Sequence, residues 1–259
     1  MPAYHENAQD ELNTPDDLAG PRKKGLRRFI EVIARDYGNL FKLNLLCLLC
    51  ILPSAALFIL YFFTGRGGAL TALLALAAAF PVGGACCACV FCISKMLRDD
   101  PGYISYDFWR KFRENMGKAA VPGLLYAAFI YIQVFLWAAY LSGGADFGAG
   151  WILPSLASLL VFGMIAPCLF LQIAYIDIPL LQLLRNSVLI AFSHVLRSVA
   201  GGLSGCVLWA AAVLFLPASL VFVPILLLLG FSFSWLLCLF WIWPVIDKTF
   251  SIDATLREK

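Results

Sequence analysis

The chain has few charged residues. Only 14% of its 259 residues are Asp, Glu, Lys or Arg, and 62% are hydrophobic, whereas an average soluble domain has about 25% charged residues. This scarcity excludes an ordinary soluble domain and indicates an integral membrane protein. The net charge of +3 is also too small to indicate a protein that binds nucleic acid.

Recognisable catalytic motifs are absent as well. The sequence has no Ser/His/Asp set, no His-Glu-x-x-His, no phosphate-binding glycine loop and no pair of carboxylates placed together in an apolar run. No Asp, Glu, Lys, Arg or His lies well inside the apolar runs, where such residues usually mark proton relays and ion-coupled transport. We therefore expect a protein that is not an enzyme and that holds no cofactor.

Long apolar runs are what the sequence has instead. A helix needs about 20 residues to cross about 30 Å of hydrocarbon. The last run, from Ser198 to Ile246, is 49 residues without an ionisable group other than Cys, and Pro217 and Pro224 bracket a turn within it. It therefore predicts two crossings, in an all-α polytopic fold with six transmembrane helices. The predicted spans are residues 43–63, 69–94, 119–141, 152–176, 198–217 and 224–246.

Basic residues are scarce on one side of this predicted topology. Six spans place both termini on the same side, and of the 19 Lys and Arg residues only Arg66 falls in a connection on the opposite side. Because Lys and Arg concentrate in cytoplasmic loops, both termini are predicted to be cytoplasmic. The outer connections are short, so any contact with soluble proteins is expected on the cytoplasmic side. The membrane domain is predicted to cover residues 21–250, between a disordered acidic tail (1–20) and a second cytoplasmic tail (251–259).

Three amphipathic segments are expected to form cytoplasmic helices, at residues 26–38, 103–118 and 179–197. The first follows the basic run PRKKGLRR and predicts a topology anchor, with an anionic-lipid site as the functional alternative. The third begins with Asp177 as a predicted N-cap. Each of the last two lies between two spans, which indicates a degenerate internal repeat.

The segment ISYDFWRKFRENMGKA is the most charged helix in the chain. Ile104, Phe108, Phe112 and Met116 recur every four residues along one stripe. Two acid-first pairs, Asp107 with Lys111 and Glu114 with Lys118, are spaced for ion pairs on a second stripe. The aromatic stripe predicts either an interfacial helix or docking against the bundle or a partner protein. The candidate docking residues are Phe108, Trp109, Lys111 and Phe112.

These patterns resemble a known family. The basic start, Asn44 and Pro53 in NLLCLLCILP, and the helix that runs into a Gly-Leu span in DFWRKFRENMGKAAVPGLL are similar to those of the YesL-like bacterial membrane proteins, a domain of unknown function (624). The resemblance extends more loosely from Phe29 to Asp247 and implies a bacterial cytoplasmic membrane protein. It further implies a role in carbohydrate uptake or its control, beside components of a sugar ABC importer. The acidic tail and the many cysteines depart from the family pattern.

Nine cysteines are the remaining candidate chemistry. Cys-x-x-C spacing suits zinc or an iron-sulfur cluster, but surrounding hydrocarbon disfavours the thiolate that a metal requires. Close packing of helices is the structural alternative, and GGACCACV from Gly83 is typical of a tight contact face. The candidate metal ligands are Cys47, Cys50, Cys86, Cys87, Cys89 and Cys92.

Three hypotheses for function follow. The first is a non-catalytic accessory or regulatory protein of a carbohydrate ABC importer that acts through its cytoplasmic helices. The second is a small-solute permease or channel, which requires a continuous polar cavity joining Asn44, Gln133 and Gln172. The third is a thiol or metal protein of the membrane.

Overall fold

The computed structural model describes residues 25–64, 68–100, 102–141, 149–214 and 229–250. Within these ranges the elements are helices and there is no strand, which confirms the all-α fold. Five helices are long and apolar enough to cross a membrane, or six if a bent pair counts as one span. The predicted tails and the turn between Pro217 and Pro224 lie outside the described residues.

The chain forms two units, one that ends at Tyr37 and one that begins at Gly38. Helix α2 (Leu26–Thr64) belongs to both, and its only non-helical backbone angles are at Asp36, where two helices join across a kink. Within the first unit, the Arg35 guanidinium lies 2.6 Å from the Asp36 carboxylate. The predicted surface helix and the first predicted span are therefore consecutive parts of one kinked helix.

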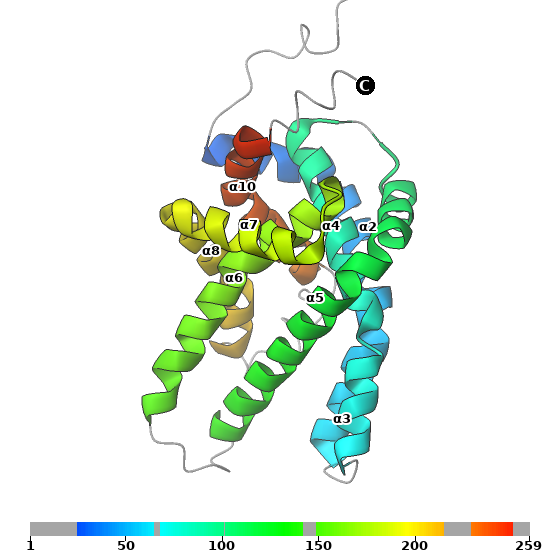
Figure 1. The fold of residues 1–259 in the computed structure, drawn as a ribbon, viewed down its shortest axis with the longest axis vertical. Coiled ribbons are helices and arrows are strands. Elements are labelled where there is room, and N and C mark those ends of the chain that lie inside the picture. The colour runs from blue at the N-terminus through cyan, green and yellow to red at the C-terminus, as the bar shows by residue number, and fades with distance from the viewer. Residues whose placement is uncertain (1–24, 65–67, 101, 142–148, 215–228, 251–259) are drawn as a thin grey trace, which may run out of the picture. The chain divides into compact units, whose positions relative to one another are not determined.

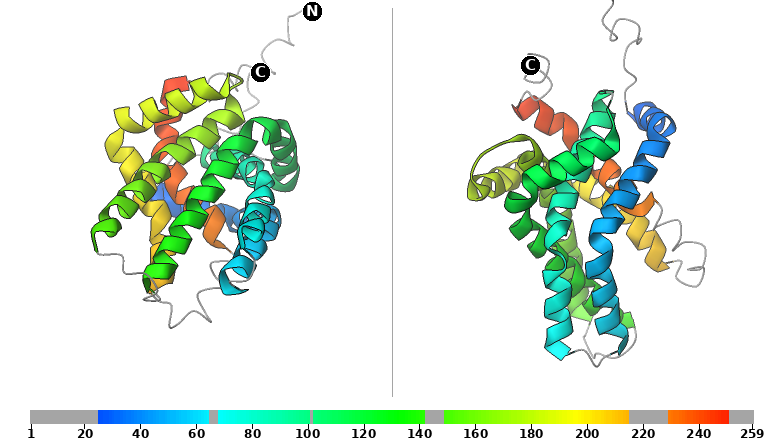
Figure 2. Two further views of the ribbon diagram at one scale, coloured as in Figure 1. Left: turned by 60° about the horizontal axis from the view of Figure 1, so that its bottom comes forward. Right: turned by 90° about the vertical axis from the view of Figure 1, so that its right-hand side faces the viewer.

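Helix α4 (Phe80–Arg98) is the central helix of the second unit. Every residue from Val82 to Ser94 is buried, because α4 packs against α5 (Ile104–Leu141), α6 (Ile152–Tyr175) and α10 (Phe231–Phe250) (Figures 1 and 2). The short helix α3 (Gly68–Ala77) precedes it, and together they form the second predicted span. The chain breaks between them, where Pro81 occupies the first turn of α4.

Helix α5 differs from the prediction. A surface helix at 103–118 and a separate span at 119–141 were expected, but α5 is one helix of 38 residues that continues through Pro122. At about 1.5 Å per residue, such a helix is far longer than the hydrocarbon layer is thick. The amphipathic segment is therefore a direct extension of a predicted span.

Helices α7 (Leu180–Ser193) and α8 (Val195–Leu214) meet at a sharp break. The chain turns by 100° at His194, and α7 lies across α6 rather than along it (Figure 1). The expected surface helix at 179–197 thus ends at Ser193. The predicted N-cap Asp177 was also wrong, because Pro179 takes that position and no side chain caps the helix.

Charged residues gather at one end of the second unit, which we call the charged end. It contains the end of α4, the start of α5 and the end of α10 (Figure 1). The end of α5 and the start of α6 lie at the opposite end of the bundle. Residues that are distant in sequence therefore meet at the charged end.

Candidate functional site

Helices α4 and α5 form an antiparallel hairpin with almost no space between their backbones. A Cβ atom added to Gly83 would overlap the Ala119 carbonyl oxygen, and one added to Gly123 would overlap the Gly83 backbone. At the next residue, a Cβ on Gly84 would lie 3.0 Å from the Met116 sulfur. The predicted contact face at GGACCACV is thus confirmed, since only small residues let two helices approach this closely.

The aromatic stripe of α5 packs inside this hairpin. Phe108 is fully buried, and its ring lies 5.5 Å from Trp109 and 6.1 Å from Phe112, measured between centroids. Phe112 faces Gly84 of α4. The sequence left open whether this stripe lies at the membrane interface or packs against the bundle or a partner protein. In the structure, Phe108 and Phe112 pack against the bundle.

The end of the hairpin is held by an ion-pair network that we call the hairpin charge cluster, formed by Lys95, Arg98, Asp100, Asp107 and Arg110. The Asp107 carboxylate accepts hydrogen bonds of 2.9 Å from both the Lys95 ammonium and the Arg110 guanidinium. Its side chain is 7% exposed and that of Lys95 is 12% exposed. Asp100 lies 3.6 Å from Lys95 and 3.7 Å from Arg98. Two cations thus converge on one nearly buried carboxylate.

Arg98 extends this cluster to α6 and α10. Its guanidinium donates a 3.0 Å hydrogen bond to the Tyr175 hydroxyl, which also lies 2.6 Å from Ser94 Oγ. The same guanidinium lies over the rings of Tyr175 and Trp243, at 5.7 and 5.6 Å from their centroids. Cation–π contacts of this kind are worth about 0.5–2 kcal/mol. The sequence reasoning missed this junction, because nothing in local spacing links Arg98 to Tyr175 or Trp243.

The two predicted ion pairs of the amphipathic segment were wrong. Asp107 pairs with Lys95 and Arg110 instead of Lys111. Lys111 pairs with Glu114 at 2.8 Å and lies over the Phe91 ring. Lys118 pairs with Asp177, in the connection between α6 and α7. This hydrogen bond and the charge of the ammonium hold the pKa of the Asp177 carboxyl below its ordinary value.

The start of α5 and Tyr103, the residue just before it, form an exposed face that points away from the hairpin and carries tyrosines and arginines. Tyr103 is 87% exposed and Tyr106 is 67% exposed. The Arg110 guanidinium lies over the Tyr106 ring at 5.6 Å, and Arg113 is exposed one turn later. We call Tyr103, Tyr106, Arg110 and Arg113 the hairpin outer face. Of the predicted docking residues, Phe108 is buried and therefore inaccessible to a partner, whereas Trp109, Lys111 and Phe112 are partly exposed. The most exposed aromatic residues in this region are the two tyrosines.

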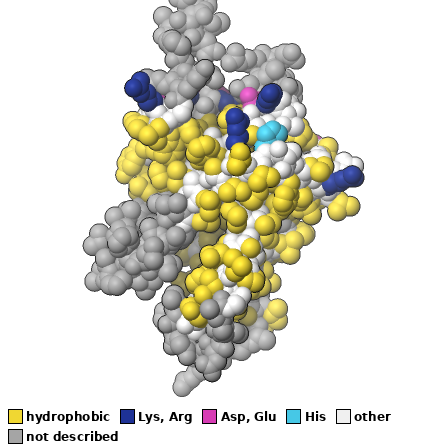
Figure 3. Space-filling model, turned by 90° about the vertical axis from the view of Figure 1, so that its left-hand side faces the viewer, with side chains coloured by type: hydrophobic (Ala, Val, Ile, Leu, Met, Phe, Trp, Pro, Cys, Tyr) yellow, Lys and Arg dark blue, Asp and Glu magenta, His cyan; other side chains and the backbone are white. Residues whose placement is uncertain are grey.

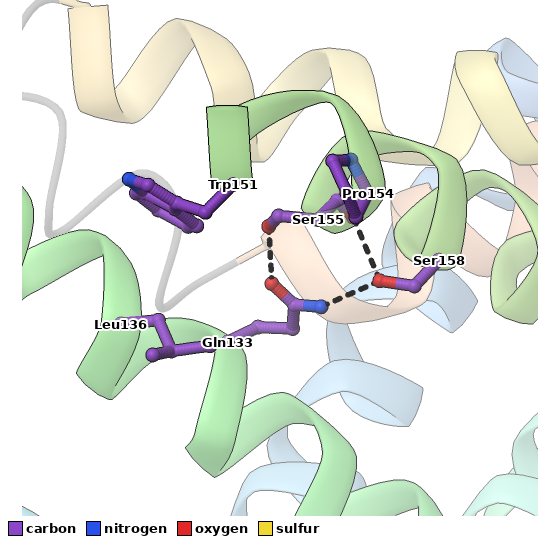
Figure 4. Close-up of a pocket in the computed structure, with 6 residues that line it drawn as sticks. All are labelled: Gln133, Leu136, Trp151, Pro154, Ser155 and Ser158. Carbon is purple, nitrogen blue, oxygen red and sulfur yellow. Dashed lines mark hydrogen bonds between the residues drawn. The ribbon is translucent and has the colours of Figure 1, made fainter. Parts of the chain in front are cut away.

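A cavity of about 430 Å³ lies between α5 and α6, beside Gln133 (Figure 4). The Gln133 amide donates a 2.8 Å hydrogen bond to Ser158 Oγ and accepts one of 2.7 Å from Ser155 Oγ. Trp137 Nε1 donates to Ser155 Oγ at 3.0 Å. These polar groups form hydrogen bonds with one another. Their role is therefore to hold α5 and α6 together and not to bind a solute. Neither Asn44 nor Gln172 lines this cavity, so it does not join the three residues that the permease hypothesis requires.

Asn44 forms hydrogen bonds with the start of α10. Its Oδ1 accepts hydrogen bonds from the backbone N–H groups of Phe231 and Ser232, at 3.1 and 3.0 Å. These groups lie in the first turn of α10, where a helix has no acceptors of its own. Asn44 of α2 therefore caps a helix 187 residues away.

Replacing Asn44 with Leu should lower the stability of the folded protein by about 1–3 kcal/mol, because two buried N–H groups lose their acceptor. The measurement is the melting temperature of the purified chain in detergent. Leu45→Ala is the control, since Leu45 is 44% exposed and its truncation should have a small effect. An Asn44→Leu protein as stable as the control would contradict the capping role.

Gln172 forms a third separate polar contact. Its Nε2 donates a 2.8 Å hydrogen bond to Ser187 Oγ, which donates to the Leu183 carbonyl at 2.7 Å. This joins α6 to α7. The Gln172 Oε1 atom is buried without a hydrogen-bond partner among the described residues. The three intramembrane polar residues thus serve three different helix contacts.

The six candidate metal-ligand cysteines are core residues. Cys47, Cys86, Cys87, Cys89 and Cys92 are fully inaccessible, and Cys50 is 7% exposed. Among the residues that the structure describes, no group of three or more His, Cys, Asp or Glu side chains is arranged to hold a metal ion. The arrangement therefore favours packing of small, weakly polar side chains.

No protein-family model, curated protein or solved structure matches the chain. The resemblance to the YesL-like family stays a prediction from the sequence. Function has to be inferred from the chain itself.

Proposed function

We propose that the protein is a non-catalytic, multi-pass protein of the bacterial cytoplasmic membrane, accessory or regulatory to carbohydrate uptake by an ABC importer. The observation that carries this proposal is the hairpin outer face. It is an exposed surface of Tyr103, Tyr106, Arg110 and Arg113 on a helix that the hairpin charge cluster fixes in place. The importer as the partner comes from the family resemblance.

The composition of this surface supports binding to a protein. Tyrosine and arginine are enriched among residues that contribute most to interfaces, and a helix fixed in advance has less conformational entropy to lose on binding. Arg113 has no ion pair with any residue that the structure describes, so its charge is left for an acidic group of the partner. We therefore expect the partner to present acidic and aromatic side chains on its cytoplasmic part.

The double substitution Tyr106→Ala with Arg113→Glu should weaken the complex at least tenfold while the protein still inserts and folds, since both side chains are exposed. The measurement is quantitative co-purification of importer components from native membranes at matched expression. Arg185→Glu, which makes the same charge change on α7, is the control and should leave the companions unchanged. An identical set of companions for the double variant and the wild type would remove the basis for docking at this surface.

The proposed orientation of the protein in the membrane can be tested with reporter fusions. A reporter fused after Lys259 should be active only when it reads the cytoplasm, and one inserted at Gly144 only when it reads the exterior. The reason is that 19 Lys and Arg residues are divided so unequally that only Arg66 lies in an outer connection. Two reporters on the same side would show that an even number of spans lies between Gly144 and Lys259, whereas the predicted topology has three.

A further inference from the structure

A basic cavity lies where the break between α7 and α8 meets the last turns of α10. Its volume is about 460 Å³, and it is lined by His194, Arg197, Pro244, Val245, Lys248 and Thr249. His194 is the residue at which the chain turns by 100°. The cavity is separate from the hairpin outer face and from the Gln133 cavity, with which it shares no lining residue.

The chemistry of this cavity is that of an anion site. Arg197 and Lys248 are exposed, and neither forms an ion pair with a residue in the described ranges. No lining residue is acidic, although Asp247 precedes Lys248 in α10. The Thr249 hydroxyl is used within its helix, because it donates to the Val245 carbonyl at 2.7 Å. The two cations are therefore the principal groups left to hold a ligand, beside the His194 ring, whose Nδ1 lies 3.0 Å from Ser193 Oγ.

The surroundings of the cavity are apolar. Leu196, next to Arg197, is 88% exposed, and Trp241, one turn before Val245, is 44% exposed. Val195, and Phe192 on the other side of His194, are exposed as well. Figure 3 shows a face of the molecule on which basic and histidine side chains lie above a broad hydrophobic surface. A ligand with a charged head and a hydrocarbon tail matches both parts.

We propose that this cavity binds the phosphate group of an anionic phospholipid. Arg197 and Lys248 pair with the phosphate, and the acyl chains lie along the exposed apolar side chains of α8 and α10. Lys and Arg near an anionic membrane surface are attracted to the lipid phosphates. Arginine adds two parallel hydrogen bonds to phosphate oxygens. The break at His194 is what places Arg197 beside the end of α10.

The test uses the purified full chain in nanodiscs that contain equal amounts of phosphatidylglycerol and phosphatidylcholine, followed by mass spectrometry of the lipids that stay bound on release. The wild type should retain phosphatidylglycerol in preference to phosphatidylcholine. Arg197→Ala with Lys248→Ala should reduce that preference on the order of tenfold, and Arg197→Lys with Lys248→Arg should restore most of it. Arg185→Ala with Lys42→Ala is the matched control, because it removes one Arg and one Lys from other exposed positions.

Two results would overturn the proposal. The first is an unchanged preference for phosphatidylglycerol in the Arg197→Ala, Lys248→Ala protein. The second is displacement of the lipid by millimolar inorganic phosphate at constant ionic strength, which would show that a free phosphate and not a lipid is the ligand. Retention of the lipid in phosphate, together with its loss in the double variant, supports the lipid site.

Discussion

Replacing Gly83 with Ala should abolish or severely reduce the yield of folded protein. The added Cβ would overlap the Ala119 carbonyl oxygen and lie 3.0 Å from the Gly123 Cα atom. Both are backbone atoms, so α4 and α5 would have to separate along the whole hairpin. Overpacking a well-packed core usually costs about 1–3 kcal/mol, and we expect a cost at or above the upper end of that range. Gly123→Ala should have the same effect, because its Cβ would overlap the Gly83 backbone.

Gly117 provides the matched control within the same helix. A Cβ there would meet nothing within 4 Å, so Gly117→Ala should leave stability unchanged or raise it by about 0.5–1 kcal/mol. The measurements are the yield of monodisperse protein in mild detergent and the melting temperature of what is recovered. Equal behaviour of the Gly83→Ala and Gly117→Ala proteins would contradict a backbone contact between α4 and α5.

Replacing Asp107 with Ala should cost about 3 kcal/mol, the lower end of the range for breaking a buried ion pair, because the nearly buried Lys95 ammonium then keeps only the Asp100 carboxylate, which is 3.6 Å away and 40% exposed. The Lys95 side chain is 12% exposed and its ammonium lies 2.9 Å from Asp107. Arg110, which pairs with the same carboxylate, is 42% exposed and can turn toward water. The melting temperature in detergent should therefore fall sharply, and the loss should be traceable to Lys95.

Two further variants separate a buried ion pair from a general defect. Lys95→Met combined with Asp107→Leu should recover most of the lost stability, since replacing both partners of a buried pair by apolar residues is often neutral. Glu114→Ala breaks an ion pair whose carboxylate is 49% exposed, and such a change should cost about 0–1 kcal/mol. If the double variant is as unstable as Asp107→Ala, the loss of the Asp107 carboxylate beside Lys95 is not the cause.

Hydropathy and small residues predicted much of this fold, because both act through the lipid environment. Apolar runs longer than about 20 residues form helices in lipid, where every backbone polar group must be paired within the segment. The run GGACCACV predicted the α4 contact face for a similar reason, since close approach of helices needs residues without bulk. These signals are local in sequence, so they can be read without knowing the partner helix.

The polar contacts could not be predicted in the same way. Spacing of four residues assigned Asp107 to Lys111, but an exposed pair of that kind is worth only about 0.2–0.5 kcal/mol. The hairpin instead offers Asp107 two cations, one of them on another helix. Asn44 likewise finds its partners in α10. Which polar partner a residue finds depends on which helix ends meet in space. The residue pattern within one helix does not predict those meetings.

The same limit explains the correction to the docking surface. The sequence predicted that the aromatic stripe at Phe108 and Phe112 contacts either a partner or the bundle. In the structure this stripe packs in the hairpin, and the exposed aromatic residues on the opposite side are Tyr106 and, just before the helix begins, Tyr103. An amphipathic pattern shows that two faces differ, but it does not show which one the protein itself covers.

Site-specific photo-crosslinking in living cells tests the central claim most directly. A photoreactive amino acid at position 106, on the hairpin outer face, should form a crosslink with one importer component. The same group at position 125 is the control, because Leu125 is also exposed on α5 but lies outside that face. The account predicts a discrete protein adduct from position 106 and none from position 125. Crosslinks to lipid alone, or the same adducts from both positions, would contradict it.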